Sequence, residues 1–254
     1  EEGAKRVGFR DARGDASALM VFHNSDLGLP YPPSGAGISR EDLLSCVRQG
    51  YYLPPRIGPD EQGGQYRGTV TAGVDVGKKC LYVVICWYPG GRQHLAYVGT
   101  VPNFEDLAPL FERFHVNSAV IDLNPETRKV RELQDKIPYL FACEFQPGDR
   151  SKGFELHMDR REMLVKMDRT MIFDRLAADV QTSQIVLPTN AESLCHGEMF
   201  KHLQCPVRME TESRGQRYFI WKERDSGHDD FFLSFVYSLV AEMVNPQPSI
   251  RQLG

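Results

Sequence analysis

Two neighbouring runs of the chain alternate or cluster apolar residues in a way that predicts β-strands. Residues 71–76 alternate small polar residues with Ala and Val, and residues 80–88 are rich in β-branched and aromatic side chains. Gly77 and two lysines separate the runs, so we predict a hairpin of two antiparallel strands. The alternation places Asp75 on the face opposite the Ala and Val side chains, between glycines too small to shield it.

Further along the chain, the pattern predicts strands and helices in alternation. We expect strands over 94–101, 118–124, 139–145 and 185–188, helices over 103–114, 125–136, 159–180 and 191–203, and a hairpin over 208–221. A strongly apolar helix is expected to follow Asp229 and Asp230. A strand, a helix and a second strand ending at Asp122 indicate a βαβ unit, in which ligands bind beyond the carboxyl ends of the strands.

The amino-terminal quarter lacks such a period. Residues 21–35 mix large apolar residues with turn formers and are expected to form an extended arm that lies on another surface. Ser39 and Asp42 have the spacing of a capping box ahead of a short apolar helix. We therefore divide the chain into an arm with a short helix (1–65), an α/β domain (66–245) and a tail (246–254).

Composition excludes several classes of protein. The net charge of −4 does not indicate general nucleic-acid binding, so any such surface must be a local basic patch. Six cysteines without a CxxC pair favour reduced, mostly buried thiols of an intracellular protein. Neither a secretory leader nor a bilayer-length apolar run is visible, so we expect a protein that is not secreted and has no membrane partner. The first residue is Glu1 rather than Met, which suggests a piece of a longer protein. No GxxxxGK[ST] phosphate loop occurs, so we expect any ATP-hydrolysing part of that protein to lie outside this piece.

Acidic residues supply the candidate chemistry. A carboxylate on a buried strand costs several kcal/mol unless a charge compensates it, and a cation is one such compensation for Asp75. Asp229 and Asp230 are also explained by capping and the helix dipole, which needs only one of them. Together with Asp122, these acids would suit Mg²⁺ or Mn²⁺, and two such ions about 3.5–4 Å apart hydrolyse phosphodiesters. His228 is placed to assist proton transfer or contact a phosphate, or simply to hydrogen-bond the backbone.

Three sequence pieces carry a resemblance to a known family. The pieces are FHNSDLGLPY at 22–31, TAGVDV at 71–76 and GHDD at 227–230 ahead of the apolar helix. In that order, with the acids, the chain resembles the ribonuclease H-like nuclease fold, and within it the nuclease half of a tailed-bacteriophage large terminase subunit. The resemblance spans residues 21–243.

The resemblance implies an α/β fold with a central mixed β-sheet flanked by helices, and a metal-dependent DNA endonuclease. Such an enzyme cuts concatemeric phage DNA during packaging, in the host cytoplasm. Asp75, Asp122 and Asp229 would be metal ligands, with Asp230 as neighbour or substitute. Implied partners are double-stranded DNA, an ATPase domain of the same polypeptide, the small terminase subunit and the portal protein.

Local basic residues are the candidates for DNA contact, although each is also explained as a solvated surface charge. They are Lys78 and Lys79 in the first hairpin, Arg128, Lys129 and Arg131 after Asp122, Arg150 and Lys152 in a loop, and Arg214 and Arg217 in the late hairpin. A zinc site at Cys195, His196, His202 and Cys205 lacks the usual finger spacing, so buried thiols are the favoured interpretation.

Three other functions remain open on the sequence. An actin-like or sugar-kinase-like ATPase also places an acid and glycines in a hairpin, but it needs a second Gly-rich loop. A transposase, integrase or junction resolvase would share the ribonuclease H-like fold. A docking domain without catalysis would use the acids only to cap helices and to pair. Metal binding separates this last possibility from the nuclease.

Overall fold

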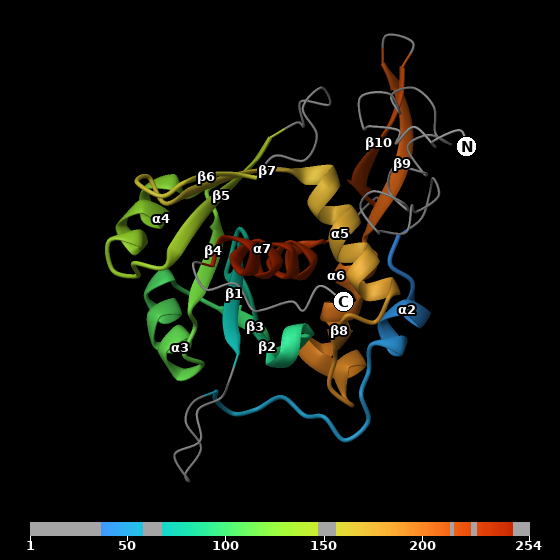
Figure 1. Ribbon diagram of the computed structural model, residues 1–254, viewed down its shortest axis with the longest axis horizontal. Coiled ribbons are helices and arrows are strands. Elements are labelled where there is room, and N and C mark those ends of the chain that lie inside the picture. The colour runs from blue at the N-terminus through green and yellow to red at the C-terminus, as the bar shows by residue number, and fades with distance from the viewer. Residues whose placement is uncertain (1–36, 58–67, 147–155, 214–215, 225–227, 246–254) are drawn as a thin grey trace, which may run out of the picture.

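The computed structural model describes residues 37–57, 68–146, 156–213, 216–224 and 228–245 (Figure 1). Most of the expected amino-terminal arm, including 21–35, lies outside these residues, as do Arg150, Lys152 and Arg214. The short helix of the arm is described. It is α2 (Arg40–Ser45), and the Ser39 side chain and Asp42 form the predicted capping box at its start.

Within the described residues, one mixed sheet contains eight strands in the order β6-β7-β5-β4-β1-β2-β3-β8. Its antiparallel part consists of β1 (Thr69–Val76), β2 (Leu81–Tyr88) and β3 (Gln93–Val101). Its parallel part continues from β1 through β4 (Ser118–Asp122), β5 (Leu140–Gln146) and β7 (Leu164–Asp168). The edges are β6 (His157–Asp159), antiparallel to β7, and β8 (Ile185–Val186), parallel to β3.

Helices cover both faces of the sheet, and the alternation along β1 decides which residues each face receives. Ala72, Val74 and Val76 join the core beneath α3 (Leu107–Arg113) and α4 (Thr127–Gln134). The other core contains α2, α5 (Arg169–Gln181), α6 (Glu198–Gln204) and α7 (Asp230–Val244). Short 3₁₀ segments lie at Pro89–Gly91, Phe104–Asp106 and Ala191–Gly197. In the described part of the chain, no helix is both long and apolar enough to cross a bilayer.

The last helix, α7, lies directly on the central strand β1 (Figure 1). A side chain at Gly73 would overlap the Ser234 carbonyl oxygen and the Ser238 amide nitrogen, so only glycine permits this approach. The Thr71 hydroxyl bonds that of Ser238 at 2.8 Å. Because Thr71 meets Ser238 and Gly73 meets Ser234, the helix runs antiparallel to the strand. Its first residues therefore lie at the end of β1 that carries Asp75.

The helix predicted over 159–180 is wrong in its first half. Residues 157–168 form β6, a turn and β7, and the helix α5 begins at Arg169. Met163 has a left-handed φ of 47° and lies in the turn, whereas Met167 is buried on β7, which pairs with β5. Their spacing of four residues therefore does not reflect a helix. Asp168 caps the true helix by accepting a hydrogen bond from the Met171 amide at 2.9 Å.

A separate two-stranded ribbon consists of β9 (Pro206–Ser213) and β10 (Gln216–Glu223), and confirms the predicted late hairpin. It extends beyond α5 in Figure 1. A buried ion pair ties its base to α5: Arg208 Nε lies 2.9 Å from Asp174 Oδ1. Trp221 Nε1 donates to the same oxygen at 2.7 Å. The base of the ribbon is therefore part of the core.

Candidate functional site

Asp75 lies at the carboxyl end of β1, directly opposite Tyr82 of β2. It is only 5% exposed, although an unpaired carboxylate is costly to bury. Burial raises its pKa well above the ordinary value, and the charges of Asp122, Asp230 and Asp229 raise it further. The Asp230 carboxyl lies within hydrogen-bonding contact, which raises the Asp75 pKa as well. Asp75 is therefore the centre of a group of four acids.

Asp122 follows Ile121, which pairs with Val74 in the parallel register of β4 and β1. The last residue of β4 therefore stands beside Asp75, as the expected βαβ unit requires. Burial raises the pKa of Asp122, while hydrogen bonds from the Asn124 amide and the Tyr237 hydroxyl lower it. The Asn124 amide is 3.1 Å from Asp122 Oδ1. These bonds fix the carboxyl at the sheet edge.

Asp229 and Asp230 open α7 above the same edge. Asp229 is the N-cap residue, but its side chain makes no capping hydrogen bond. It is 7% exposed. Its pKa is raised to about 6, mainly by burial and secondly by the charge of Glu223. Arg169 lowers that pKa, because its Nη2 lies 3.7 Å from Asp229 Oδ2. The Oδ2 atoms of both acids are buried and lack a hydrogen-bond partner among the described residues.

Capping and local pairing account for only part of this group, in which Asp229 contacts Arg169. Capping would need a bond from Asp229 to the first-turn amides, and pairing would need a cation beside Asp75. The structure instead places Asp122, Asp229 and Asp230 close enough to the buried Asp75 for their charges to raise its pKa. Among the described residues, no three His, Cys, Asp or Glu side chains converge closely enough to hold a metal ion as they stand. Hard oxygen donors with unpaired buried atoms nevertheless suit a divalent cation.

The basic candidates divide into two groups. Lys78 and Lys79 are exposed in the turn that follows β1, at the same end of the strand as Asp75. On α4, Arg128 forms an ion pair with Glu132 and Lys129 with Glu126, and Arg131 donates a hydrogen bond to Gln134. Arg217 lies on β10. Among the described candidates, Lys78 and Lys79 are thus the exposed basic residues at the acid end of β1.

Two residues near the acids were not predicted for this site. Arg169, the counter-charge of Asp229, follows the N-cap residue Asp168, which the sequence pattern had hidden inside a longer helix. His202, considered only for zinc, instead contacts the start of α7.

His228 is mostly exposed, with Nδ1 3.8 Å from Asp230 Oδ2. The Cys195 thiol donates to the Val98 carbonyl, and all six cysteines are free.

No family model matches the chain, and no curated protein matches it by sequence. Solved structures do match. A mutant nuclease domain of the large terminase subunit gp2 of bacterial virus Sf6, with manganese, has a TM-score of 0.52 at 10% identity, covering 78% of this chain and 96% of that one. The same domain with calcium gives the same values. The large terminase nuclease from thermophilic phage G20c has a TM-score of 0.46 at 16% identity, over 68% of this chain and 82% of that one.

Identities this low show the fold alone. The central mixed sheet, flanked by helices on both faces, matches the predicted class, and the Sf6 domain is covered almost completely. The chain therefore has the ribonuclease H-like fold of phage large-terminase nuclease domains.

Proposed function

We propose that this chain is a metal-dependent DNA endonuclease of a viral DNA-packaging motor. The observation that carries the proposal is the meeting of Asp75, Asp122, Asp229 and Asp230 at one sheet edge, where two buried oxygens lack a hydrogen bond among the described residues. The Sf6 nuclease domain, which shares the fold, was solved with manganese and with calcium. A divalent ion would add positive charge to that of Arg169, which contacts Asp229 alone of the four acids among the described residues.

The four acids would hold Mg²⁺ or Mn²⁺, which activate water and stabilise charge on the leaving oxygen of a phosphodiester. The chain's own residues set the geometry. Asp75 and Asp122 are fixed on rigid neighbouring strands, and Asp229 and Asp230 are brought to them by the close contact of α7 with β1. A two-metal arrangement is the form of this site that we propose.

Positive groups beside the acids would hold the DNA backbone. Lys78 and Lys79 project from the turn after β1, and Arg169 stands between Asp229 and Glu223, 3.7 and 3.9 Å from their carboxyl oxygens. Contacts of this kind go to phosphates and carry little sequence preference. His228 is a further group for proton transfer or phosphate contact at the same edge. Arg150, Lys152 and Arg214 remain predictions, since they lie outside the described residues.

The substrate we propose is concatemeric double-stranded phage DNA, cut in the host cytoplasm during virus assembly. The expected partners are an ATPase domain of the same polypeptide, the small terminase subunit and the portal protein. The division into an arm (1–65), a nuclease domain (66–245) and a tail (246–254) belongs to this proposal.

Conversion of supercoiled plasmid to nicked and linear forms tests the proposal. The purified chain is incubated with Mg²⁺, Mn²⁺ or EDTA beside Asp75→Asn, Asp229→Asn and Asp230→Asn, with exposed Glu105→Gln as the matched control. We expect cutting in either metal by the wild type and the control, none in EDTA, and a loss of at least about 100-fold in the Asp variants. Metal-dependent cutting that survives Asp75→Asn would place the chemistry elsewhere. No metal effect on either cutting or melting temperature would favour a docking domain.

A further inference from the structure

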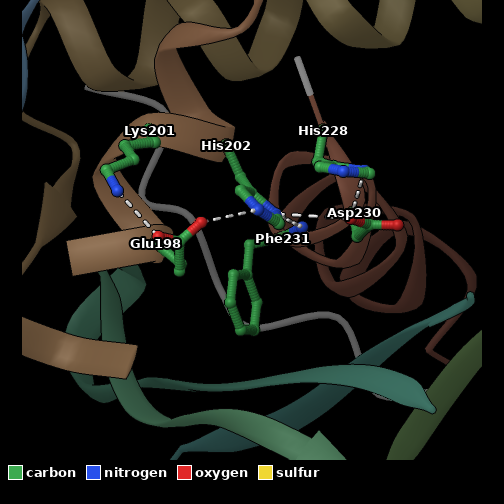
Figure 2. Close-up of polar contacts among 6 residues, drawn as sticks. All are labelled: Glu198, Lys201, His202, His228, Asp230 and Phe231. Atoms are coloured by element: carbon green, nitrogen blue, oxygen red, sulfur yellow. Dashed lines mark hydrogen bonds and ion pairs between the residues drawn. The ribbon is translucent and has the colours of Figure 1, made fainter. Parts of the chain in front are cut away.

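The first turn of α7 takes a hydrogen-bonding partner from outside the helix. The first four amides of any helix lack partners within it, and the N-cap side chain normally supplies one. Here Asp229 does not do so. The Phe231 amide instead donates to Nδ1 of His202 on α6, at 3.3 Å (Figure 2).

The His202 ring is held firmly in this position. It is 4% exposed, and its centroid lies 5.2 Å from that of Phe231 and 5.7 Å from that of Tyr82. Tyr82 is the residue paired with Asp75 across β1 and β2, so the ring is packed beside the central strand of the site. Because Nδ1 accepts a hydrogen bond, the neutral ring carries its proton on Nε2.

The proton on Nε2 faces an acid on the same helix. Glu198 Oε2 lies 3.6 Å from Nε2, and Lys201 holds the other oxygen of Glu198 at 2.7 Å (Figure 2). A histidine that is oriented through one nitrogen by a carboxylate presents the other in a fixed tautomer. His202 therefore lies between the Glu198 carboxylate, at ion-pair distance, and the Phe231 amide, from which it accepts a hydrogen bond.

The hydrogen bond between His202 and Phe231 fixes the helix turn that carries Asp230, but His202 donates no hydrogen bond to the Asp230 carboxylate. Its Oδ2 lies 3.5 Å from the same Nδ1, yet has no hydrogen-bond partner among the described residues. The lone pair of Nδ1 is directed to the Phe231 amide, so it offers no proton to the carboxylate. Asp230 thus keeps an unpaired oxygen while the turn that carries it is fixed.

We propose that His202 is a positioning residue for the acid cluster, which caps α7 in place of Asp229 and so leaves both Asp229 and Asp230 available to a divalent cation. This role rests on the proposed nuclease function. It goes beyond that function because it assigns the N-capping of α7 to a residue of α6, whereas the N-cap residue of a helix ordinarily does this itself.

Three substitutions separate positioning from simple packing. His202→Asn keeps an acceptor close to the position of Nδ1, His202→Gln moves the polar atoms one bond outward, and His202→Leu removes them. Glu105→Gln, an exposed substitution outside this arrangement, is the matched control. His202→Gln keeps the test possible if His202→Leu does not fold.

The hydrogen-exchange rate of the Phe231 amide, measured by NMR in EDTA, tests the hydrogen bond to His202 in the absence of metal. We expect exchange about 5-fold faster or more in His202→Gln and His202→Leu, as loss of a cap implies, and near wild-type exchange in His202→Asn and Glu105→Gln. Equal exchange in all variants would overturn the capping role.

The positioning role is tested by titrating Mn²⁺ and measuring the melting temperature. The quantity compared between variants is the Mn²⁺ concentration that gives half of the rise. We expect it to increase about 10-fold or more in His202→Gln and His202→Leu, and to stay within about 3-fold in His202→Asn. A lower metal-free melting temperature with an unchanged Mn²⁺ midpoint would show a merely structural residue and overturn the inference. If the wild type itself does not respond to Mn²⁺, the proposed function and the positioning role both fail, whereas the exchange rates still decide whether His202 caps α7.

Discussion

Gly73 lies so close to Ser234 that a methyl group on its Cα would overlap the Ser234 carbonyl oxygen. This contact sets how deeply α7 lies on β1, and with it the distance between the acid on the strand and the two acids at the helix start. The Ser234 hydroxyl adds a hydrogen bond to the Tyr82 carbonyl at 3.0 Å, so the helix is bound to both strands of the hairpin. Packing of the last helix and assembly of the acid cluster are therefore one event.

Gly73→Ala is expected to destabilise the protein by at least about 2–3 kcal/mol, because α7 must move away from β1. The matched control is Gly50→Ala. Nothing lies within 4 Å of a side chain there, and only the left-handed φ of +78° opposes it, which costs about 1 kcal/mol. Urea unfolding in EDTA measures both values. Equal losses in the two variants would contradict the crowding that we describe at Gly73.

Asp75→Asn is expected to have opposite effects on stability and on metal binding. Without metal, the melting temperature should rise by about 2–5 °C, because the substitution removes a buried charge surrounded by three other acids. The increase that Mn²⁺ causes in the wild type should disappear. Thermal melts in EDTA and in millimolar Mn²⁺ give both results, with Glu105→Gln as control. A variant that is less stable in EDTA and still responds to Mn²⁺ would argue against the site.

The metal-free protein should lose stability as the pH rises from about 4 to about 6.5. Asp229 has its pKa raised from 3.8 to about 6 in the folded state, so the folded protein binds this proton more tightly than the unfolded chain does. The resulting penalty is absent below pH 4, grows between the two pKa values, and reaches about 2–3 kcal/mol above them. The raised pKa of Asp75 acts in the same direction.

Urea unfolding in EDTA at pH 4, 5.5 and 7 checks this dependence. Asp229→Asn should flatten the part that belongs to Asp229, and Arg169→Gln, which removes the nearby cation, should extend the loss to higher pH. Glu105→Gln should retain the wild-type slope. An unchanged slope in Asp229→Asn would mean that another group causes the dependence.

The ion pair beneath the β9–β10 ribbon should respond differently to single and paired substitutions. Asp174→Asn leaves the buried Arg208 charge without its carboxylate and is expected to cost about 3–5 kcal/mol. The double variant Asp174→Leu with Arg208→Met should cost less than Asp174→Asn, because no buried charge is left unpaired. Urea unfolding of the single and double variants provides the comparison. A double variant worse than the single one would show that the pair stabilises beyond charge compensation.

Much of the fold could be predicted from local pattern. Alternation through residues 71–76 correctly divided the two faces of β1, and the capping box of Ser39 and Asp42 lies where its spacing indicated. The long helix over 159–180 failed because two methionines four residues apart satisfy a helical period as well as a strand and a turn. Asp168, a strong N-cap residue within that run, was the available signal of the true helix start.

The candidate site could be predicted only as a set of residue types. Acids at strand ends and at a helix start indicate one sheet edge, and the structure brings Asp75, Asp122, Asp229 and Asp230 together there. Sequence could not show that Asp229 leaves its own helix uncapped, since that depends on α6 supplying His202 from outside. The Arg169 contact was equally hidden, because it depends on where α5 begins and how the base of β10 approaches it.

The docking of α7 on Gly73 also has a consequence for when the site can exist. Two of its acids come from strands near residues 75 and 122, whereas the other two arrive only with the helix over 230–244. During synthesis, or in a chain clipped before residue 228, the sheet edge would hold two carboxyls and no helix above them. A phosphodiester-cutting centre of the kind we propose would therefore be assembled only after α7 has packed on β1.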